Sequence, residues 1–272
     1  DSVAEYYEKW ISSGINIISP GRKCASGPLS RYKRVMQARK DNCVNWQFES
    51  SVGSALPILT TLQDLQETGD QVKFIRGCVS GTMAYVLRNM SKDTPFSEAV
   101  RQTIDQKFAE NDLREDLSGL DTARKAVILA RQLGMDVDVE DVEVDSIIPD
   151  GIINKDYTGS WAEIDDAVIE DLKALDGEMM ERLQAALDND QVLRYKFVID
   201  KEANTVRCAL ESVDNTDPLY RLKANENLVS FETSRYTTSP LIVKGAAAGP
   251  ELAASGIFSD LLRLTRAYSS LD

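Results

Sequence analysis

The sequence predicts an α/β protein, on the basis of three observations. Helical and strand-like segments alternate over the first 50 residues, in the order that is typical of a doubly wound fold. A region of mixed helices and strands follows. From about residue 192 the pattern changes to four short apolar or alternating runs separated by turn residues, which predicts an antiparallel sheet. No internal repeat interrupts this order.

The first alternation is too short to make a complete doubly wound sheet. Its expected elements are a helix over 2–13, a strand over 15–19, a helix over about 28–40 and a strand over 44–48. No G-x-G-x-x-G fingerprint follows a strand anywhere in the chain. The sequence therefore predicts either a fragment that lacks the N-terminal half of such a fold, or a chain that does not bind a dinucleotide alone.

The rest of the chain is predicted as follows. The middle region is expected to hold a helix within 52–70, a strand over 71–81 that turns into a helix at Thr82, a helix over 95–108 capped by Ser97, a helix over 122–134 that ends at Gly134, and an acidic, solvated helix over 163–189. The strands of the antiparallel sheet are expected over 192–200, 205–213, 227–236 and 240–245. A loop of small residues and a final helix close the chain.

Charge and composition exclude several classes of function. The 272 residues carry 31 Lys and Arg against 44 Asp and Glu, a net charge of −13, and a surface of that sign repels the phosphates of nucleic acids. No apolar stretch approaches the roughly 18 residues that indicate a membrane span. Because the chain contains no His, acid–base chemistry falls to Lys, Tyr, Asp or Glu, and triads that need an imidazole are excluded.

The cysteines and the first residues indicate a compartment. Cys24, Cys43, Cys78 and Cys208 are widely spaced and form no CxxC pair, which predicts buried, reduced thiols rather than a zinc site. The first residues have neither the basic nor the apolar region of a signal peptide. We expect a cytoplasmic protein, or a plastid protein if the source is photosynthetic.

The strongest candidate for chemistry is the stretch FAENDLREDLSGLDTARK at 108–125, which holds five carboxylates and three cations and runs into an apolar helix. Asp121 and Lys125 are four residues apart and therefore share a face of that helix. Since the helix is apolar almost all round, its charged first turn is expected in a cleft or an interface. There an ammonium among carboxylates can bind a zwitterion or act as an acid–base group. The alternative is an ordinary charge pair at a helix start.

Three shorter stretches give weaker signals. ESSVGSALP at 49–57 combines a carboxylate with small residues, which lets backbone carbonyls converge on a cation, or is simply a tight turn before a helix. SGT at 80–82 lies where a strand becomes a helix, so its N–H groups and hydroxyl can bind an anion. GAAAG at 245–249 is another loop of small residues before a helix.

Together these stretches resemble homoserine dehydrogenase, in the form found in fungi, in plants and in bifunctional aspartokinase–homoserine dehydrogenases. The family signature, close to YTEPDPRDDLSGxDVARK, is matched by residues 108–125. ISPGRKCASGPL at 18–29 is similar to the family's TPNKKANSGPL, and FESSVGSALPI at 48–58 to its YEATVGAGLPI. The SGT turn and the closing GIFSDLLR match as well. The resemblance covers essentially the whole chain, in order.

The resemblance implies a domain organisation. The fold is expected to be α/β, with a remnant of a doubly wound nucleotide-binding domain and a mixed α/β catalytic domain whose sheet is used for dimerisation. The implied boundaries are 1–51 for the C-terminal part of the nucleotide-binding (Rossmann-like) domain, 52–191 for the catalytic, substrate-binding region, 192–243 for the dimerisation sheet, and 244–272 for a loop and helix that return to the nucleotide-binding domain.

The resemblance also implies an activity and its partners. The family interconverts aspartate 4-semialdehyde and L-homoserine in threonine and methionine biosynthesis, and NADPH or NADH supplies the hydride. The implied cofactors are NADP or NAD and a monovalent cation, sodium or potassium. The implied partners are a small-molecule substrate and a second copy of the chain, in a homodimer or a higher homo-oligomer, with neither nucleic acid nor membrane.

The resemblance assigns site residues by position. The catalytic roles fall on Lys125, Lys23 and Asp121, substrate binding on Glu110, Asp116, Gly81 and Thr82, cofactor binding on Ser19, Arg22, Lys23 and Gly249, and the cation on backbone oxygens of Glu49, Val52, Ser54 and Leu56. These residue types suit the interconversion of an aldehyde and an alcohol on an amino acid. The substrate ammonium requires carboxylates, and a developing alkoxide requires a cation and a proton. We expect Glu110, Asp116, Asp121, Lys125 and Lys23 to line one pocket.

The departures from the family pattern gather on the cofactor side. Gly21 and Arg22 replace the Asn and the first Lys of the TPNKKA motif, and Ala247 replaces the first glycine of the C-terminal GAGxxVTA loop. Two interpretations of different class follow. The chain is the catalytic and dimer-forming part of an active homoserine dehydrogenase, or it is a weakened paralogue or fragment that acts as an amino-acid-binding or subunit-association module.

Overall fold

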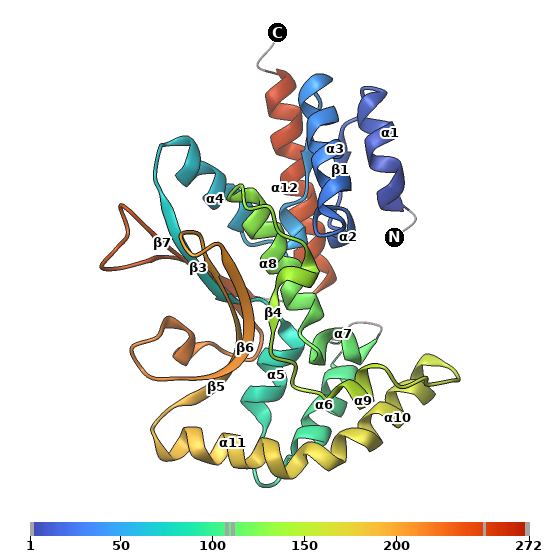
Figure 1. Ribbon diagram of the computed structural model, residues 1–272, viewed down its shortest axis with the longest axis vertical. Coiled ribbons are helices and arrows are strands. Elements are labelled where there is room, and N and C mark those ends of the chain that lie inside the picture. Colours follow the sequence, from blue (N-terminus) through green and yellow to red (C-terminus); the bar gives the residue numbers. More distant parts are fainter. Residues whose placement is uncertain (1–2, 107–108, 110–111, 247–248, 270–272) are drawn as a thin grey trace.

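The computed structural model describes residues 3–106, 109, 112–246 and 249–269 (Figure 1). Over these residues helices and strands form an α/β protein with two sheets, so the predicted fold class is confirmed. None of the helices in this part of the chain is long and apolar enough to cross a membrane.

The N-terminal part forms a small α/β layer around a two-stranded parallel sheet. Its elements are η1 (Val3–Tyr6), α1 (Tyr7–Ser12), β1 (Ile17–Ile18), α2 (Arg22–Ala25), α3 (Leu29–Asp41), β2 (Trp46–Gln47) and η2 (Glu49–Ser51). Ile17 pairs with Trp46, whose ring is buried against Tyr7 and Phe48. The strands are shorter than predicted, because each pairs only with the other and over two residues.

The chain returns to this layer at its C-terminal end. Helix α12 (Pro250–Ser269) packs against β1 and η2, and in Figure 1 it lies at the same end of the molecule as the N-terminal elements. The first turn of α12 is thereby brought next to the loop that follows β2.

The second sheet has six strands. They are β3 (Val72–Cys78), β4 (Glu143–Val144), β5 (Val192–Asp200), β6 (Thr205–Val213), β7 (Glu226–Thr233) and β8 (Leu241–Ala246), in the order β4-β6-β5-β3-β7-β8. All neighbours are antiparallel except β4 and β6, so the predicted antiparallel sheet is confirmed. The sheet nevertheless extends beyond 192–243, because β3 inserts between β5 and β7. Its residues Ile75 and Cys78 are buried, as suits an interior strand.

Helices cover this sheet, and one of them, α8, is packed on several sides. They are α4 (Ile58–Glu67), α5 (Gly81–Asn89), α6 (Phe96–Asp105), α7 (Leu113–Leu117), α8 (Leu120–Gln132), η3 (Val139–Asp141), α9 (Asp150–Ile153), α10 (Trp161–Leu172), η4 (Lys173–Leu175), α11 (Asp176–Asp188) and η5 (Pro218–Arg221). Helix α8 packs against β5 and β6 and also against α2 and α4. Nearly every residue from Asp121 to Arg131 is buried, as the apolar pattern predicted.

Three local predictions were wrong. Helix α6 begins after Pro95, and Ser97 does not cap it: the backbone N–H and hydroxyl of Ser97 donate to the Asp176 carboxylate at 2.7 and 2.8 Å, so the acceptor comes from α11. The single acidic helix over 163–189 is two helices, α10 and α11, joined by the tighter turn η4. Cys43 is exposed, because it lies in the turn after α3 with φ +52, whereas the other three free cysteines are buried.

Candidate functional site

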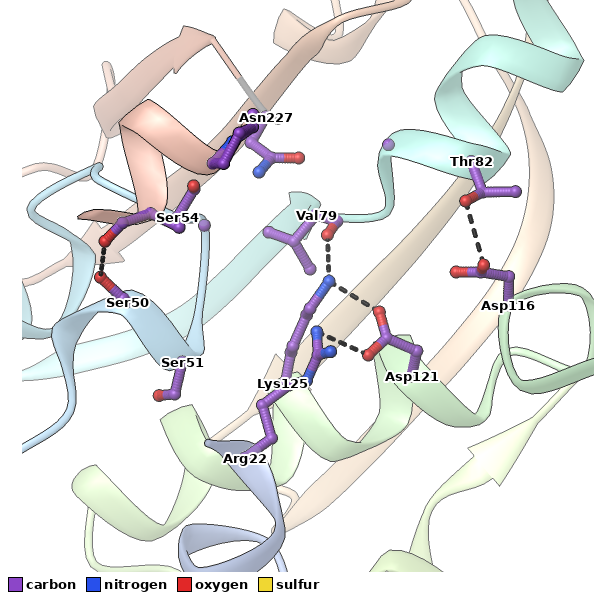
Figure 2. A pocket seen from close by; sticks show the side chains of 15 residues that line it. Arg22, Ser50, Ser51, Ser54, Val79, Thr82, Asp116, Asp121, Lys125 and Asn227 are labelled. Carbon is purple, nitrogen blue, oxygen red and sulfur yellow. Dashed lines mark hydrogen bonds and ion pairs between the residues drawn. The ribbon is translucent and has the colours of Figure 1, made fainter. Parts of the chain in front are cut away.

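A cavity of about 300 Å³ opens where distant parts of the chain meet. Its walls come from the first turns of α5 and α8, from α2, from the loop that contains η2, and from the first turn of α12 (Figure 2). The charged side chains Arg22, Asp116, Asp121 and Lys125 gather on the wall formed by α2, α7 and α8. The opposite wall is built from neutral residues of the η2 loop, β7 and α12.

Lys125 lies at the centre of the charged wall and is only 8% exposed. Its Nζ lies 2.7 Å from Asp121 Oδ2 and donates to the Val79 carbonyl at 2.6 Å, as Figure 2 shows. An ammonium carries three N–H donors. Two of them have these partners, which leaves the third for a ligand in the cavity. The predicted pair therefore exists, and it is buried rather than exposed at a helix end.

Asp121 is bound by a second cation. Arg22 Nη1 lies 2.8 Å from Asp121 Oδ1, on the side away from the oxygen that meets Lys125. Burial by itself raises the pKa of the Asp121 carboxyl, but Lys125 and then Arg22 lower it, and the net shift is downward from the ordinary value. Asp121 is therefore a permanent anion at neutral pH, and it fixes the ammonium of Lys125.

The other end of the charged wall joins a carboxylate to the start of a helix. The Thr82 hydroxyl donates to Asp116 Oδ2 at 3.0 Å, and both side chains are buried. Helix α5 begins here because Ser80 is its N-cap and accepts from Met83 N at 3.2 Å. The N–H groups of Gly81 and Thr82 belong to the first turn, which has no acceptors of its own within the helix. A carboxylate and helix N–H groups thus lie side by side.

The η2 loop is held by a buried acid. Glu49 caps α4, because its carboxylate accepts from Leu59 N at 2.7 Å, from Thr60 N at 3.0 Å and from the Thr60 hydroxyl. Arg263 of α12 lies 3.3 Å from the same carboxylate, and Asp260 accepts from the Glu49 N–H at 3.0 Å. One acid therefore connects the η2 loop to both α4 and α12.

Comparison with known proteins shows the family to which the chain belongs. The family model for homoserine dehydrogenase matches residues 57–262, which include β3, α5, α7 and α8. The chain belongs to the homoserine dehydrogenase family. It is 36% identical over 264 residues to the chloroplastic bifunctional aspartokinase/homoserine dehydrogenase 1 of Zea mays, and 34% identical over 269 residues to the homoserine dehydrogenase of Emericella nidulans. It covers 28% of the maize protein and 72% of the fungal one, with 97% of this chain aligned in both.

Solved structures of other proteins share the fold of this chain. A Candida auris protein of unknown function superposes with a TM-score of 0.87 at 34% identity, over 97% of this chain and 74% of that one. A hyperthermophilic archaeal homoserine dehydrogenase, solved in complex with NADPH, superposes with a TM-score of 0.72 at 19% identity, over 98% of this chain and 69% of that one. At that identity the likeness shows the fold alone.

The structure places most of the residues predicted from the homoserine dehydrogenase resemblance around the cavity. The lining residues include Asp116, Asp121, Lys125, Gly81, Thr82, Arg22, Gly249 and Ser54. Ser19 lies apart from them, where its hydroxyl accepts from the Tyr7 hydroxyl at 2.7 Å and from Gly21 N at 3.1 Å. Glu110 lies outside the described residues.

Lys23 does not line this cavity, contrary to the expectation of a single pocket. It is exposed on α2 and lines two neighbouring cavities together with Arg124. Consecutive helical residues point about 100° apart. Because Arg22 occupies the direction toward Asp121, Lys23 is turned away from it. Arg22, which the resemblance placed with the cofactor, is the cation that reaches Asp121.

Two buried polar lining residues were missed by sequence reasoning. Ser51 and Asn227 are both buried and reach the cavity from its neutral wall. Ser51 lies within the small-residue stretch 49–57, which was noted only for its carbonyl groups. For Asn227, the one signal was an amide at the start of an otherwise apolar strand.

The loop predicted to hold a monovalent cation has donors of a suitable kind. The Glu49 carbonyl accepts from Val52 N at 3.3 Å, and the Leu56 carbonyl accepts from Ile58 N at 2.8 Å. A carbonyl oxygen has two lone pairs, so each retains capacity for a hard cation. Within the described residues no group of three or more His, Cys, Asp or Glu side chains could hold a metal ion. A site here would therefore depend on backbone oxygens.

Proposed function

We propose that this chain is the substrate-binding and catalytic part of an NAD(P)H-dependent homoserine dehydrogenase, which interconverts aspartate 4-semialdehyde and L-homoserine in threonine and methionine biosynthesis. One observation carries the proposal: a buried ammonium, Lys125, is fixed by Asp121 and Val79 with one donor directed to a cavity. The cavity is of a size that admits a small amino acid. Membership of the homoserine dehydrogenase family supports the assignment.

The carbonyl end of the substrate is assigned to Lys125. A reduced nicotinamide bound beside this end would supply the hydride for the aldehyde carbon. The third N–H of Lys125 donates to the aldehyde oxygen, stabilises the negative charge that develops there and transfers a proton to it, which completes the alcohol. Asp121 and the Val79 carbonyl hold Nζ in place, so no reorganisation is needed as the charge develops. In the reverse direction a neutral Lys125 amine accepts the proton of the homoserine hydroxyl.

The amino-acid end of the substrate is assigned to the Asp116 side of the cavity. A carboxylate is the strongest partner for the substrate ammonium, and the buried carboxylate of Asp116, which accepts from the Thr82 hydroxyl, lines the cavity. The substrate carboxylate suits the N–H groups of Gly81 and Thr82, since a helix N-terminus attracts anions. Glu110, from the same signature, is proposed as a second partner for the ammonium.

The nicotinamide cofactor, NADP or NAD, is assigned to the side formed by α2 and the start of α12. Gly249 has φ +132 and no side chain, so its backbone can approach a ligand closely. Arg22 and Lys23 supply cations on the same side, and both line a cavity of about 510 Å³ next to the first one. Together with Arg124 they outnumber the two carboxylates of that cavity, Asp112 and Glu115, so its net charge suits an anionic cofactor. Ser19 is proposed to contribute at the end of β1.

A monovalent cation, sodium or potassium, is proposed to stabilise the η2 loop. Its ligands would be the backbone oxygens of Glu49, Val52, Ser54 and Leu56. The left-handed φ of +63 at Ser54 supports a turn that can gather carbonyls around an ion.

Self-association is proposed through the six-stranded sheet. Strand β8 is the edge beyond β7, and Ile242 on it is 41% exposed. An apolar edge strand of this kind pairs readily with another copy about a twofold axis. Strand β7, whose apolar sequence also predicts a partner, is an interior strand between β3 and β8. A strictly monomeric mass at micromolar concentration would contradict a homodimer.

The test compares two variants in the complete natural protein that contains this chain. Lys125→Met removes the ammonium and keeps the apolar stem, so kcat should fall by about a hundredfold or more, the usual size of general acid–base catalysis. Asp116→Asn weakens a contact made in both the ground state and the transition state, so it should mainly raise the KM for homoserine. Lys33→Met, at an exposed ion pair with Asp136, is the control.

The kinetics also separate the two interpretations left by the sequence. If the wild type neither reduces aspartate semialdehyde nor oxidises homoserine, the chain is an amino-acid-binding or subunit-association module. If the wild type is active and Lys125→Met retains full turnover, the acid–base role moves elsewhere, with Lys23 the next candidate.

A further inference from the structure

Ser54 is held in a backbone conformation that serine rarely adopts. Its φ is +63, in the left-handed region, where a Cβ costs free energy and glycine is favoured. Close packing on both sides holds the residue there: a Cβ at Gly53 would lie 2.2 Å from Ile58 Cδ1, and a Cβ at Gly256 of α12 would lie 3.0 Å from the Ser54 carbonyl oxygen. Strained residues that are fixed by their surroundings cluster at functional sites, so we examined what the Ser54 side chain can bind.

The hydroxyl of Ser54 is accessible to a ligand. Ser54 lines the same cavity as Lys125, and its Oγ makes no hydrogen bond with any residue that the structure describes. The residue is only half-buried, and its Oγ, unlike that of Ser51, retains contact with solvent. By comparison, the hydroxyl of Ser50 in the same loop donates to the Ala253 carbonyl at 3.4 Å. A ligand in the cavity can therefore reach the Ser54 hydroxyl, which both donates and accepts.

The position of Ser54 indicates which group it binds. Figure 2 shows Ser54 on the side of Lys125 away from Thr82 and Asp116, where the amino-acid end of the substrate is assigned. The wall to which Ser54 belongs is neutral, so it suits an uncharged polar group, whereas a zwitterion is matched by the charged wall. A hydride donor must contact the aldehyde carbon held at Lys125. Its ring therefore enters from the side that the substrate leaves open, which is the side of Ser54.

We propose that the hydroxyl of Ser54 binds the nicotinamide half of the cofactor, through one hydrogen bond to an uncharged polar group, the carboxamide or a ribose hydroxyl. This inference rests on the proposed function, since it assigns a further residue to the same site. The strained turn sets the direction of the hydroxyl, and the hydrogen bond fixes the nicotinamide half relative to the substrate. Ser54 is thus a cofactor-binding residue through its side chain.

The test is a binding measurement that needs no turnover. Dissociation constants of the complete natural protein are measured by calorimetric titration with NADPH and NADH, and with the matching ADP-ribose, which lacks the nicotinamide. Ser54→Ala removes the hydroxyl and keeps the Cβ, so it should weaken binding of the tighter reduced cofactor about fivefold, the effect of one hydrogen bond, and leave binding of the ADP-ribose unchanged. The reduced 3-acetylpyridine analogue, with a methyl ketone for the carboxamide, separates the two groups. If Ser54→Ala abolishes a preference for the natural cofactor, the carboxamide is the partner; equal weakening of both assigns the ribose.

Two further variants keep the outcome decisive. Ser54→Gly also removes the hydroxyl but relieves the strain, so it should raise the Tm, show the same fivefold loss, and serve even if Ser54→Ala folds poorly. Asn204→Ala, at an exposed turn position with φ +55, is the matched control and should change none of the constants. If both Ser54 variants bind the reduced cofactor like the wild type, weaken the ADP-ribose equally, or raise only the KM for homoserine, the assignment of Ser54 alone is wrong. Absence of binding of both NADPH and NADH by the wild type overturns the proposed function as well.

Discussion

Arg22 Nη1 lies 2.8 Å from Asp121 Oδ1, and this ion pair joins α2 of the N-terminal layer to the first turn of α8. The pair is mostly buried on the Asp121 side, so solvent screens it weakly. Because the second oxygen of Asp121 meets Lys125, a residue on the cofactor side of the cavity is coupled to the proposed proton donor through one carboxylate.

Removing Arg22 should change the pH dependence of catalysis. Arg22 is one of the two cations that hold the pKa of the Asp121 carboxyl below its ordinary value, so Arg22→Gln should raise that pKa. The acid limb of the kcat profile for aspartate-semialdehyde reduction, in which the ammonium held by ionised Asp121 is the proposed proton donor, should then move to higher pH. Arg22→Lys should restore part of the wild-type profile. An acid limb that does not move in Arg22→Gln would show that Asp121 does not control Lys125.

The Asp121 pair should also contribute to stability in a defined pH range. The pKa of the Asp121 carboxyl is lower in the folded state than its unfolded value of about 3.9. The stability that the ionised carboxylate contributes is therefore present above the unfolded pKa. It is lost as the pH falls from about 5 through the pKa of the folded state. At pH 7, Asp121→Asn should lower the free energy of unfolding by about 3–5 kcal/mol, because it leaves the buried Lys125 unpaired. In urea unfolding the difference from the wild type should narrow below pH 4. A difference independent of pH would contradict an ionic origin.

The sequence predicted most of the residues of the charged wall, but not which of two adjacent cations of α2 belongs to it. The i, i+4 spacing of Asp121 and Lys125 on an apolar helix predicted their common buried face, and the resemblance added Asp116, which also lines the cavity. Local periodicity carries no information on which of two adjacent cations turns inward. That choice depends on the packing of α2 against α8, and it brought Arg22 rather than Lys23 to Asp121.

The long-range parts of the fold were the least predictable. Strand β3 reads as a local strand before a helix, and only tertiary pairing places it between β5 and β7. Ser97 has the residue type and position of a cap, yet Asp176, 79 residues away, supplies the acceptor. Asn227 could not be recognised as a lining residue either, because the cavity that it lines is built jointly by β7, α12 and α8.

The buried acid of the η2 loop should be important for stability. Glu49→Gln weakens charge-assisted hydrogen bonds to Leu59 N and Thr60 and leaves Arg263 with one carboxylate fewer, so it should lower the free energy of unfolding by about 1.5–3 kcal/mol. Glu67→Gln, at the exposed C-terminal end of α4, should change the free energy of unfolding by less than about 0.5 kcal/mol. Equal effects of the two substitutions would rule out Glu49 as the anchor of the loop.

The start of α8 should tolerate no side chain at Gly119. Its φ is +81, and a Cβ there would lie 1.8 Å from Tyr195 Oη on β5 and 3.1 Å from Val144. Gly119→Ala should therefore combine backbone strain with overpacking and lower the free energy of unfolding by about 2–4 kcal/mol. Because α8 carries Asp121 and Lys125 in its first two turns, kcat should fall too.

Two comparisons separate the strain at Gly119 from the clash. Gly134 ends the same helix with φ +76, and a Cβ added there would meet no atom within 4 Å, so Gly134→Ala should cost only about 1–2 kcal/mol, the strain alone. Tyr195 Oη is buried without a hydrogen-bond partner in the described residues, so Tyr195→Phe should cost little by itself and should recover part of the loss in a double variant with Gly119→Ala. If Gly119→Ala is no more destabilising than Gly134→Ala, or if Tyr195→Phe gives no recovery, the packing of β5 does not set the position of α8.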